Sequence, residues 1–445
     1  MPKVTSQFVC QNCGATFSKW AGKCMQCGAW DSLVESAPIT TGSKSASHAV
    51  AAKPDKLSAI QSAKTPRITT TIGEVDTVLG GGIVPGSLIL LAGDPGIGKS
   101  TLVLQLAGIL SGQKRKVLYV SGEESANQIK LRAERITGLS EEFDFAATTD
   151  LDSVLSLVVS EDYDLVVVDS IQTMSSSASA SAAGTVSQIT NGANQLMQSA
   201  KSTNTAFIII GHVTKEGNLA GPRLLEHLVD VVLYLEGDKY GMVKFLRGVK
   251  NRFGATDEVG VLEMTDSGLQ PVVNPSGLLL EERSLAPGSV VFAAMEGSRP
   301  LLVEVQALVS PSVFGYPKRA GVGVDLNRLN MLCAVLTKRG GINLSASDVY
   351  VNIVGGLKIS EPAIDLAIIC ALASAQKNVI INSHLVVFGE VGLSGEIRTV
   401  NSTERRLREA KKLGYKSALT APHSSLKGLR LPHNIAEAVK IITKK

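Results

Sequence analysis

A glycine-rich segment, GDPGIGKS at residues 93–100, carries the residue types that bind the phosphates of a nucleotide. It satisfies the spacing G-x-x-x-x-G-K-[ST] and lies between an apolar run and an apolar helical pattern. Glycines let backbone N–H groups curl around a phosphate, and the following helix start adds a favourable dipole. We expect Lys99 to contact the β- and γ-phosphates and the Ser100 hydroxyl to bind Mg²⁺. The predicted nucleotide contacts are Gly93, Asp94, Pro95, Gly96, Ile97, Gly98, Lys99, Ser100 and Thr101.

Carboxylates that follow two other apolar runs are candidates for the chemistry at this loop. Asp169 ends the run DLVVVD, where an acid can hold the water shell of Mg²⁺. Glu123, in VSGEES, can polarise the attacking water, but Glu124 is its immediate neighbour and the pattern does not separate the two. The alternative interpretation is that Asp169 only ends a strand and that the glutamates only favour a helix N-terminus.

Four further residues have the spacing of metal ligands, because two CxxC pairs are separated by ten residues: Cys10, Cys13, Cys24 and Cys27. Four thiolates at this spacing suit tetrahedral Zn²⁺, and a closed four-cysteine site is structural rather than catalytic. The alternative is a redox dithiol or disulfides. We expect a zinc-ribbon module at residues 1–35 that needs the metal to fold and that recognises a partner.

The length and composition bound the class of protein that must position these residues. A chain of 445 residues with 44% apolar and 19% charged residues predicts a globular protein of two or three domains. The net charge of +4 is compatible with a nucleic-acid partner but does not establish one. No apolar run reaches the ~18 residues of a membrane span, and no secretory signal is recognisable. We therefore expect a cytoplasmic protein without a membrane partner.

The pattern along the chain predicts two further folded regions after the cysteine-rich module of residues 1–35. Residues 36–66, which follow that module, are rich in Ser, Ala, Lys and Thr, and we expect a flexible linker there. From residue 67 to 270, continuous apolar runs alternate with helical patterns, as in a parallel sheet covered on both faces. A proline-rich segment then marks a boundary, and residues 271–445 carry both strand and helix patterns. The predicted fold is an α/β core that follows the small cysteine-rich module and is followed by a separate α+β or α/β domain at the C-terminal end.

Two loops and one basic pair are candidates for contact with a charged polymer. The loops are MSSSASASAAGTVSQ, which we do not expect to form core, and HVTKEGNLAGPR, which carries His212, Lys215 and Arg223. Both follow predicted strands at the end of the sheet where the nucleotide loop lies. Lys250 and Arg252, in KNRFG, project to one side of an extended chain and can reach a neighbour's γ-phosphate. The alternatives are two solvated loops and a basic edge strand.

Six segments in this order resemble the RadA (Sms) family of bacterial DNA repair proteins: CQNCGATFSKWAGKCMQCGAWDSL, GDPGIGKSTL, VSGEES, VVVDSIQTM, GHVTKEG and KNRFG. The resemblance runs nearly end to end. It implies a RecA-like P-loop ATPase core that forms hexameric rings around single-stranded DNA. It also implies a DNA-dependent ATPase and helicase-like motor that extends the branches of branched recombination intermediates together with the RecA recombinase. The implied cofactors are ATP, Mg²⁺ and Zn²⁺.

The same resemblance implies roles for individual residues. It makes Glu123 the catalytic carboxylate and Asp169 the acid that holds Mg²⁺. Lys250 and Arg252 belong to a signature motif that couples ATP hydrolysis across subunits to DNA movement. The catalytic residues would be Lys99, Glu123, Asp169, Lys250 and Arg252, and the DNA-binding residues would be Lys215, Arg223, Lys250 and Arg252.

The C-terminal region resembles the peptidase domain of Lon protease, with two departures from its active site. Ala363 stands where the nucleophilic serine would be, and Glu404 stands where the general-base lysine would be. Without a hydroxyl nothing attacks a carbonyl, so we expect no proteolysis. We expect instead a ring-forming platform that offers basic surface to DNA, with Lys318, Arg319 and Arg328 as candidates. Two other functions remain open at this point, an ATP-dependent peptidase and a regulatory ATPase with the same core.

Overall fold

The structure is a computed structural model, and it describes most of the chain. The described residues are 7–10, 16–17, 19–30, 32–36, 66–136, 138–178, 181–212, 225–237, 243–313, 316–422 and 431–444. No helix among them is both long enough and apolar enough to cross a membrane.

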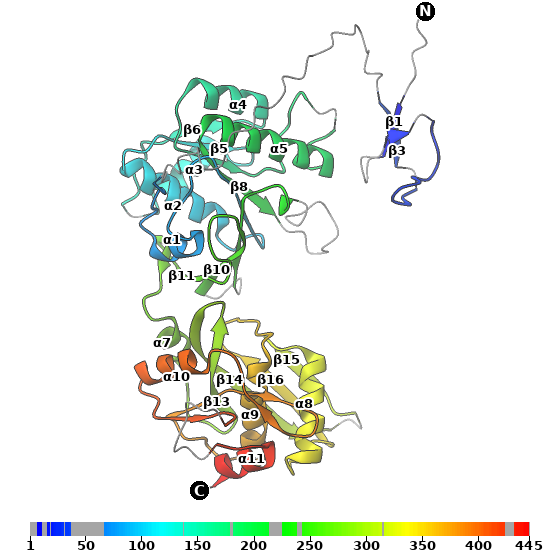
Figure 1. Ribbon diagram of the computed structural model, residues 1–445, viewed down its shortest axis with the longest axis vertical. Coiled ribbons are helices and arrows are strands. Elements are labelled where there is room, and N and C mark those ends of the chain that lie inside the picture. Colours follow the sequence, from blue (N-terminus) through cyan, green and yellow to red (C-terminus); the bar gives the residue numbers. More distant parts are fainter. Residues whose placement is uncertain are drawn as a thin grey trace, which may run out of the picture.

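The central region folds around a nine-stranded sheet of order β12-β11-β10-β9-β4-β8-β7-β5-β6 (Figure 1). The six strands from β9 to β6 run parallel to one another, and β10 to β12 extend the sheet as antiparallel strands. The strands are β4 (Leu88–Gly93), β5 (Val117–Ser121), β6 (Asp144–Ala147), β7 (Leu165–Asp169), β8 (Ala206–His212), β9 (Val231–Glu236), β10 (Val243–Asn251), β11 (Val259–Thr265) and β12 (Gly268–Pro271).

Helices cover both faces of this sheet, as the continuous apolar strands require. One apolar cluster joins the sheet to α1 (Gly73–Leu79), α2 (Lys99–Gly112) and α3 (Ala126–Ala133). A second cluster joins the opposite face to α4 (Leu151–Ser160) and α5 (Val186–Thr203). Because all residues of β4, β5 and β7 are buried, the carboxyl ends of these strands are fixed in position, and the functional loops begin there.

The C-terminal region is a second α/β unit, built on a six-stranded sheet of order β15-β16-β14-β13-β17-β20. Its strands are β13 (Ser289–Glu296), β14 (Arg299–Pro311), β15 (Arg319–Val322), β16 (Ser347–Ile353), β17 (Leu385–Val387) and β20 (Ser417–Leu419). A separate pair is formed by β18 (Glu390–Val391) and β19 (Ile397–Arg398). The helices are α7 (Pro275–Leu280), α8 (Leu326–Arg339), the 3₁₀ turn η2 (Pro362–Ile364), α9 (Asp365–Lys377), α10 (Thr403–Lys412) and α11 (Ile435–Thr443).

The two units share apolar core and ion pairs where they meet below β10 and β11 (Figure 1). Val243, Phe245, Val259 and Val261 of the central sheet belong to the same buried cluster as the core of the C-terminal unit. Arg247 of β10 bridges Glu236, at 2.7 Å, and Glu296 at the end of β13, at 2.6 Å. The predicted boundary at residue 270 falls inside β12, which pairs with β11 through Pro271.

The N-terminal module is a three-stranded antiparallel sheet of order β2-β1-β3. Its strands are β1 (Gln7–Cys10), β2 (Thr16–Phe17) and β3 (Leu33–Ser36). Among the residues of this module that the structure describes, Cys10, Cys24 and Leu33 are buried, and Phe8, Phe17 and Ala21 pack against them. So small a core contributes little burial, which agrees with the expectation that the module needs a metal.

One expectation about the loop after Asp169 was wrong. The segment MSSSASASAAGTVSQ was not expected to form core, yet Met174 and Gln188 are almost fully buried. Asp152 of α4 accepts hydrogen bonds from Ser176 Oγ, at 2.8 Å, and from the backbone N–H of Ser177, at 2.7 Å. Small hydroxyl residues therefore serve here as partners of a helix carboxylate, a use that composition alone does not reveal.

Candidate functional site: the phosphate loop and its neighbours

The phosphate loop lies between β4 and α2, at the carboxyl edge of the parallel strands. Gly93 and Gly98 have φ of 150° and 115°, which only glycine adopts without strain. A Cβ atom on Gly93 would lie 2.3 Å from the carbonyl oxygen of Leu235, so the loop also needs glycine for its close approach to β9. The first turn of α2 has N–H groups without intrahelical partners, and these suit a phosphate.

Lys99 is the buried cation of this loop. Its Nζ donates to the carbonyl oxygens of Gly93, at 2.8 Å, and Asp94, at 2.9 Å, so the side chain folds back over the loop. Burial lowers the pKa of Lys99, and the negative charges of Asp169, Asp94 and Glu123 oppose that fall. The structure therefore brings the predicted lysine and both predicted carboxylates into one electrostatic environment.

Asp169 ends β7 beside β5, with Ser121 as its register partner. Its side chain is buried, and its Oδ2 accepts a 2.8 Å hydrogen bond from the hydroxyl of Tyr119. Burial and the Asp169 carboxylate raise the pKa of Tyr119 well above its ordinary value, so the hydroxyl stays protonated and donates. Tyr119 was not singled out from the sequence, where it reads as one more buried residue of an apolar strand.

The two neighbouring glutamates have different surroundings. Glu123 follows β5 and accepts a 2.6 Å hydrogen bond at Oε1 from Ser170, the residue after Asp169. Glu124 forms an ion pair with Arg132 of α3 and accepts its hydrogen bond. Of these two glutamates, Glu123 is the one whose negative charge raises the pKa of Lys99. The two glutamates therefore differ in their partners, a difference that the sequence pattern alone did not show.

Lys250 and Arg252 both contact the segment just before β9. Lys250 Nζ donates to the carbonyl oxygens of Glu226, at 2.7 Å, and Val229, at 2.8 Å. Arg252 forms a 2.9 Å ion pair with Asp230, whose other oxygen accepts from the N–H of Leu88. Burial and the charge of Arg252 lower the pKa of Lys250. The two side chains share one side of the chain, at the amino edge of the parallel strands, opposite to the phosphate loop.

Three predicted site residues lie outside the described residues: Cys13, Lys215 and Arg223. The sequence predictions for them stay predictions.

Three of the four predicted zinc ligands lie together. The Sγ atoms of Cys10, Cys24 and Cys27 are all within 4.8 Å of one another. The 3.7 Å between the Sγ atoms of Cys10 and Cys27 is far from the ~2.05 Å of a disulfide. It matches the ~3.8 Å between thiolates bound to one tetrahedral zinc with Zn–S bonds of ~2.3 Å. Gly28, at φ 75°, turns the chain so that its N–H donates to the Cys24 carbonyl. The residues present therefore fit Zn²⁺.

We expect the purified protein to carry roughly one zinc per chain. Cys24→Ser should lose this zinc and make residues 7–36 sensitive to limited proteolysis, because the small core cannot hold the module alone. Elemental analysis by mass spectrometry measures the metal. Cys333→Ser is the matched control, since Cys333 is buried in the C-terminal unit, and its zinc content should not change. Full zinc content in Cys24→Ser would contradict this assignment.

The two C-terminal residues compared with a peptidase site carry neither a nucleophilic hydroxyl nor a basic amine. Ala363 is buried in η2, and its carbonyl oxygen accepts a 2.7 Å hydrogen bond from the N–H of Gly389. Glu404 lies in the first turn of α10 and lines a cavity of about 470 Å³ formed by residues 399–405. The structure thus gives the Ala363 position a methyl group that is buried and not nucleophilic.

Two of the basic residues proposed as DNA-facing surface are partly exposed and have partners within the C-terminal unit. Arg328 donates through Nε and Nη2 to the two carboxylate oxygens of Asp365, both at 2.5 Å. Arg319 donates to the backbone carbonyls of Leu344, at 2.8 Å, and Ser347. Sequence alone did not reveal these roles, because Asp365 and Leu344 are distant in the chain from the arginines that they bind.

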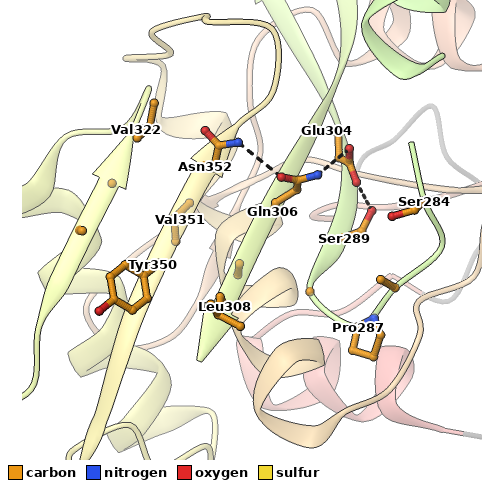
Figure 2. A pocket seen from close by; sticks show the side chains of 15 residues that line it. Ser284, Pro287, Ser289, Glu304, Gln306, Leu308, Val322, Tyr350, Val351 and Asn352 are labelled. Atoms are coloured by element: carbon orange, nitrogen blue, oxygen red, sulfur yellow. Dashed lines mark hydrogen bonds between the residues drawn. The ribbon is translucent and has the colours of Figure 1, made fainter. Parts of the chain in front are cut away.

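A cavity of about 420 Å³ lies on the open face of the C-terminal sheet, over β14, β15 and β16 (Figure 2). Figure 2 shows Leu308 on β14, Val322 on β15 and Tyr350 on β16, with Glu304 farther along β14. Glu304 accepts from Ser289, at 2.5 Å, and from Gln306, at 3.1 Å. All lining residues come from 284–352, so this cavity is no part of the nucleotide site.

Three protein families match parts of the chain. The family described as "AAA domain" matches residues 53–218, which include the phosphate loop and Asp169. "Rubredoxin metal binding domain" matches residues 8–35, and "Subunit ChlI of Mg-chelatase" matches residues 329–424. Fold and site together define a RecA-like P-loop ATPase with an N-terminal zinc ribbon and a ChlI/Lon-like C-terminal region.

Curated relatives cover almost the whole chain. A protein of Halalkalibacterium halodurans is 47% identical over 440 residues, 98% of this chain and 96% of its own length. A protein of Bacillus subtilis is 47% identical over 455 residues, 99% of each chain, and one of Brucella abortus is 48% identical over 433 residues, 94% and 92%. All three are named DNA repair protein RadA, and the chain belongs to this RadA family. The resemblance in the sequence motifs is therefore confirmed.

Two solved structures are similar over less than half of the chain. "Crystal structure of the RadB recombinase" is 26% identical, with a TM-score of 0.37, and is matched over 46% of this chain and 99% of its own. The solved ATPase domain of another protein is 15% identical, with a TM-score of 0.41, over 47% of this chain and 92% of its own.

Proposed function

We propose that the chain is a DNA-dependent ATPase and helicase-like motor of DNA repair, which promotes branch migration and the processing of recombination intermediates. Its proposed partners are single-stranded and branched DNA, a RecA recombinase and further copies of itself in a hexameric ring. ATP is the proposed fuel, and the proposed site of action is the cytoplasm. The relatives named DNA repair protein RadA support the repair role.

The residues of the phosphate loop would divide the work on ATP. Lys99 would bind the phosphates after leaving the carbonyl oxygens of Gly93 and Asp94. Ser100 and Asp169 would hold Mg²⁺, which when bound neutralises charge on the phosphate oxygens. Glu123 would orient and deprotonate the attacking water. The shared electrostatic environment of Lys99, Asp169 and Glu123 supports this division.

One observation carries the motor proposal: Lys250 and Arg252 cannot serve the nucleotide of their own chain. In the sheet, Lys250 lies opposite Val232, three residues and about 10 Å before Leu235, which lies opposite Gly93. Both side chains then turn farther away, toward residues 226–230. Contact with a γ-phosphate would therefore be made on a neighbouring subunit, where a cation stabilises charge developing in hydrolysis.

Mixed-subunit ATPase assays test this arrangement. Lys99→Ala disables the nucleotide site of its own subunit, and Lys250→Ala removes the cation that a subunit supplies to the site of its neighbour. Each variant alone should therefore lose about tenfold or more of its DNA-stimulated ATPase activity. Mixed together, they should recover activity above the sum of the two, because a Lys99→Ala subunit still supplies Lys250 to an intact site. Single-stranded DNA should raise the rate of the unmodified protein.

The control is Lys116→Ala, which removes a lysine paired with Glu161 on the surface and should leave the rate unchanged. A mixture no more active than its two components would contradict action between subunits. Equal rates with and without DNA in a folded preparation would contradict the motor itself.

We also propose that the C-terminal unit does not cleave peptides. The methyl side chain of Ala363 and the carboxylate of Glu404 support this, since neither can act as the nucleophile or the amine of a serine–lysine pair. A platform that holds subunits together is the role that we propose for it.

A further inference from the structure

Tyr119 and Asp169 meet because of strand register. In the sheet, Tyr119 of β5 lies opposite Val167 of β7, so Asp169 is its diagonal neighbour on the same face. A spacing of ~4.8 Å between parallel strands and a rise of ~3.3 Å per residue give a diagonal separation of roughly 8 Å, which a tyrosine side chain can span. The Tyr119 hydroxyl, at the end of this side chain, donates a 2.8 Å hydrogen bond to Asp169 Oδ2.

The ring of Tyr119 is held in place on its other side. It packs against Phe145 of β6, with ring centroids 6.2 Å apart and planes 23° apart, and against Phe143, at 6.3 Å. Tyr119 is among the largest fully buried side chains. Aromatic packing of this kind restricts the ring to one orientation, so the position of the hydroxyl is restricted as well.

We propose that Tyr119 is the positioning residue for the acid that holds Mg²⁺. Its hydrogen bond occupies Oδ2 of Asp169 and fixes the plane of the carboxylate, so that Oδ1 is the oxygen left to face the metal and its water. The inference rests on the proposed role of Asp169. Partners that orient a metal-binding carboxylate in this way commonly change metal affinity or activity about 10–100-fold when removed.

Mg²⁺ titration of nucleotide binding tests the proposal on the full-length protein. Tyr119→Phe keeps the ring and removes only the hydroxyl. The Mg²⁺ concentration that half-saturates tight binding of a fluorescent ADP should rise about tenfold. Affinity for the same ADP in the presence of a chelator should not change, because the phosphate loop itself is untouched. The Mg²⁺ midpoint of ATP hydrolysis should rise in parallel.

Tyr163→Phe is the matched control. Tyr163 is also buried, and its hydroxyl donates to Asp144 at 2.7 Å, but this pair lies away from the phosphate loop. Its Mg²⁺ midpoint should equal that of the unmodified protein. A Tyr119→Phe midpoint that matches Tyr163→Phe would overturn the proposal.

Asp169→Asn distinguishes a failure of the inference about Tyr119 from a failure of the proposed role of Asp169 in binding Mg²⁺. If Asp169→Asn raises the Mg²⁺ midpoint and Tyr119→Phe does not, the inference about Tyr119 alone is wrong. If Asp169→Asn leaves the midpoint unchanged, the assignment of Asp169 to the metal is wrong, and the inference about Tyr119 falls with it.

Discussion

Glu123→Gln should lower ATP turnover by about 10²–10³-fold while nucleotide binding persists. The amide keeps the shape of the side chain and can still accept the hydrogen bond that Ser170 Oγ gives to Oε1. It cannot take a proton from the attacking water, and it removes one of the negative charges that act on Lys99. Single-turnover hydrolysis measures the chemical step, and equilibrium binding of a fluorescent nucleotide shows that the site still fills.

Glu124→Gln is the matched control, one residue away and of the same size. Its carboxylate pairs with Arg132, and both side chains are about 30% exposed, at 29% and 30%. The loss of such a pair costs little, so turnover should stay within a few-fold of the unmodified protein. A larger loss in Glu124→Gln than in Glu123→Gln would move the catalytic role to Glu124.

Arg328→Met should strongly destabilise the C-terminal unit. Asp365 is fully buried, and Arg328 gives its carboxylate two hydrogen bonds of 2.5 Å. Burial raises the pKa of Asp365, and the hydrogen bonds from Arg328 oppose that rise. Removing one partner of a buried pair costs about 3–5 kcal/mol, because the other charge is left unpaired. The melting temperature should therefore fall by roughly 10 °C.

A double variant separates the lost pair from lost packing. In Arg328→Met with Asp365→Leu no charge is left buried, so much of the stability should return. Arg398→Met is the exposed control, since Arg398 is 58% exposed in its pair with Glu396, and its melting temperature should hardly move. If Arg328→Met melted normally and bound DNA less tightly, the structural role proposed for Arg328 would be wrong and a DNA-facing role would be favoured.

Much of the central fold follows from local pattern in the sequence. The run KSTLVLQLAGILSG coincides with α2, and the run DLVVVD contains β7. These elements are predictable because burial on all sides leaves a continuous apolar signal. The strand β6, DFAA, was missed because its residues are at most half-buried and only four of them pair. The extension of the central sheet through β11 and β12 was missed because the formation of such strands depends on their packing against neighbouring strands more than on their own sequence.

Part of the candidate site could likewise be predicted from local sequence, and part depends on contacts between distant segments. The phosphate loop is a contiguous motif, so its residues could be named from spacing alone. The hydrogen bond from Tyr119 to Asp169 joins residues 50 positions apart, and it depends on which strands are neighbours and in what register. The partners of Lys250 and Arg328 could not be predicted for the same reason. The residues next to a basic residue in the sequence do not indicate whether its side chain contacts water or a distant part of the chain.

The apolar cluster common to β10, β11 and the C-terminal sheet limits how this architecture can be recombined. Phe245 and Val261 face side chains from the other unit, so each half has been fitted to the other's surface. A chimaera that exchanged the C-terminal half for that of a distant relative would bring mismatched shapes against these residues. Any such exchange would have to carry the β10–β11 hairpin with it, and with that hairpin the Lys250 motif at its end.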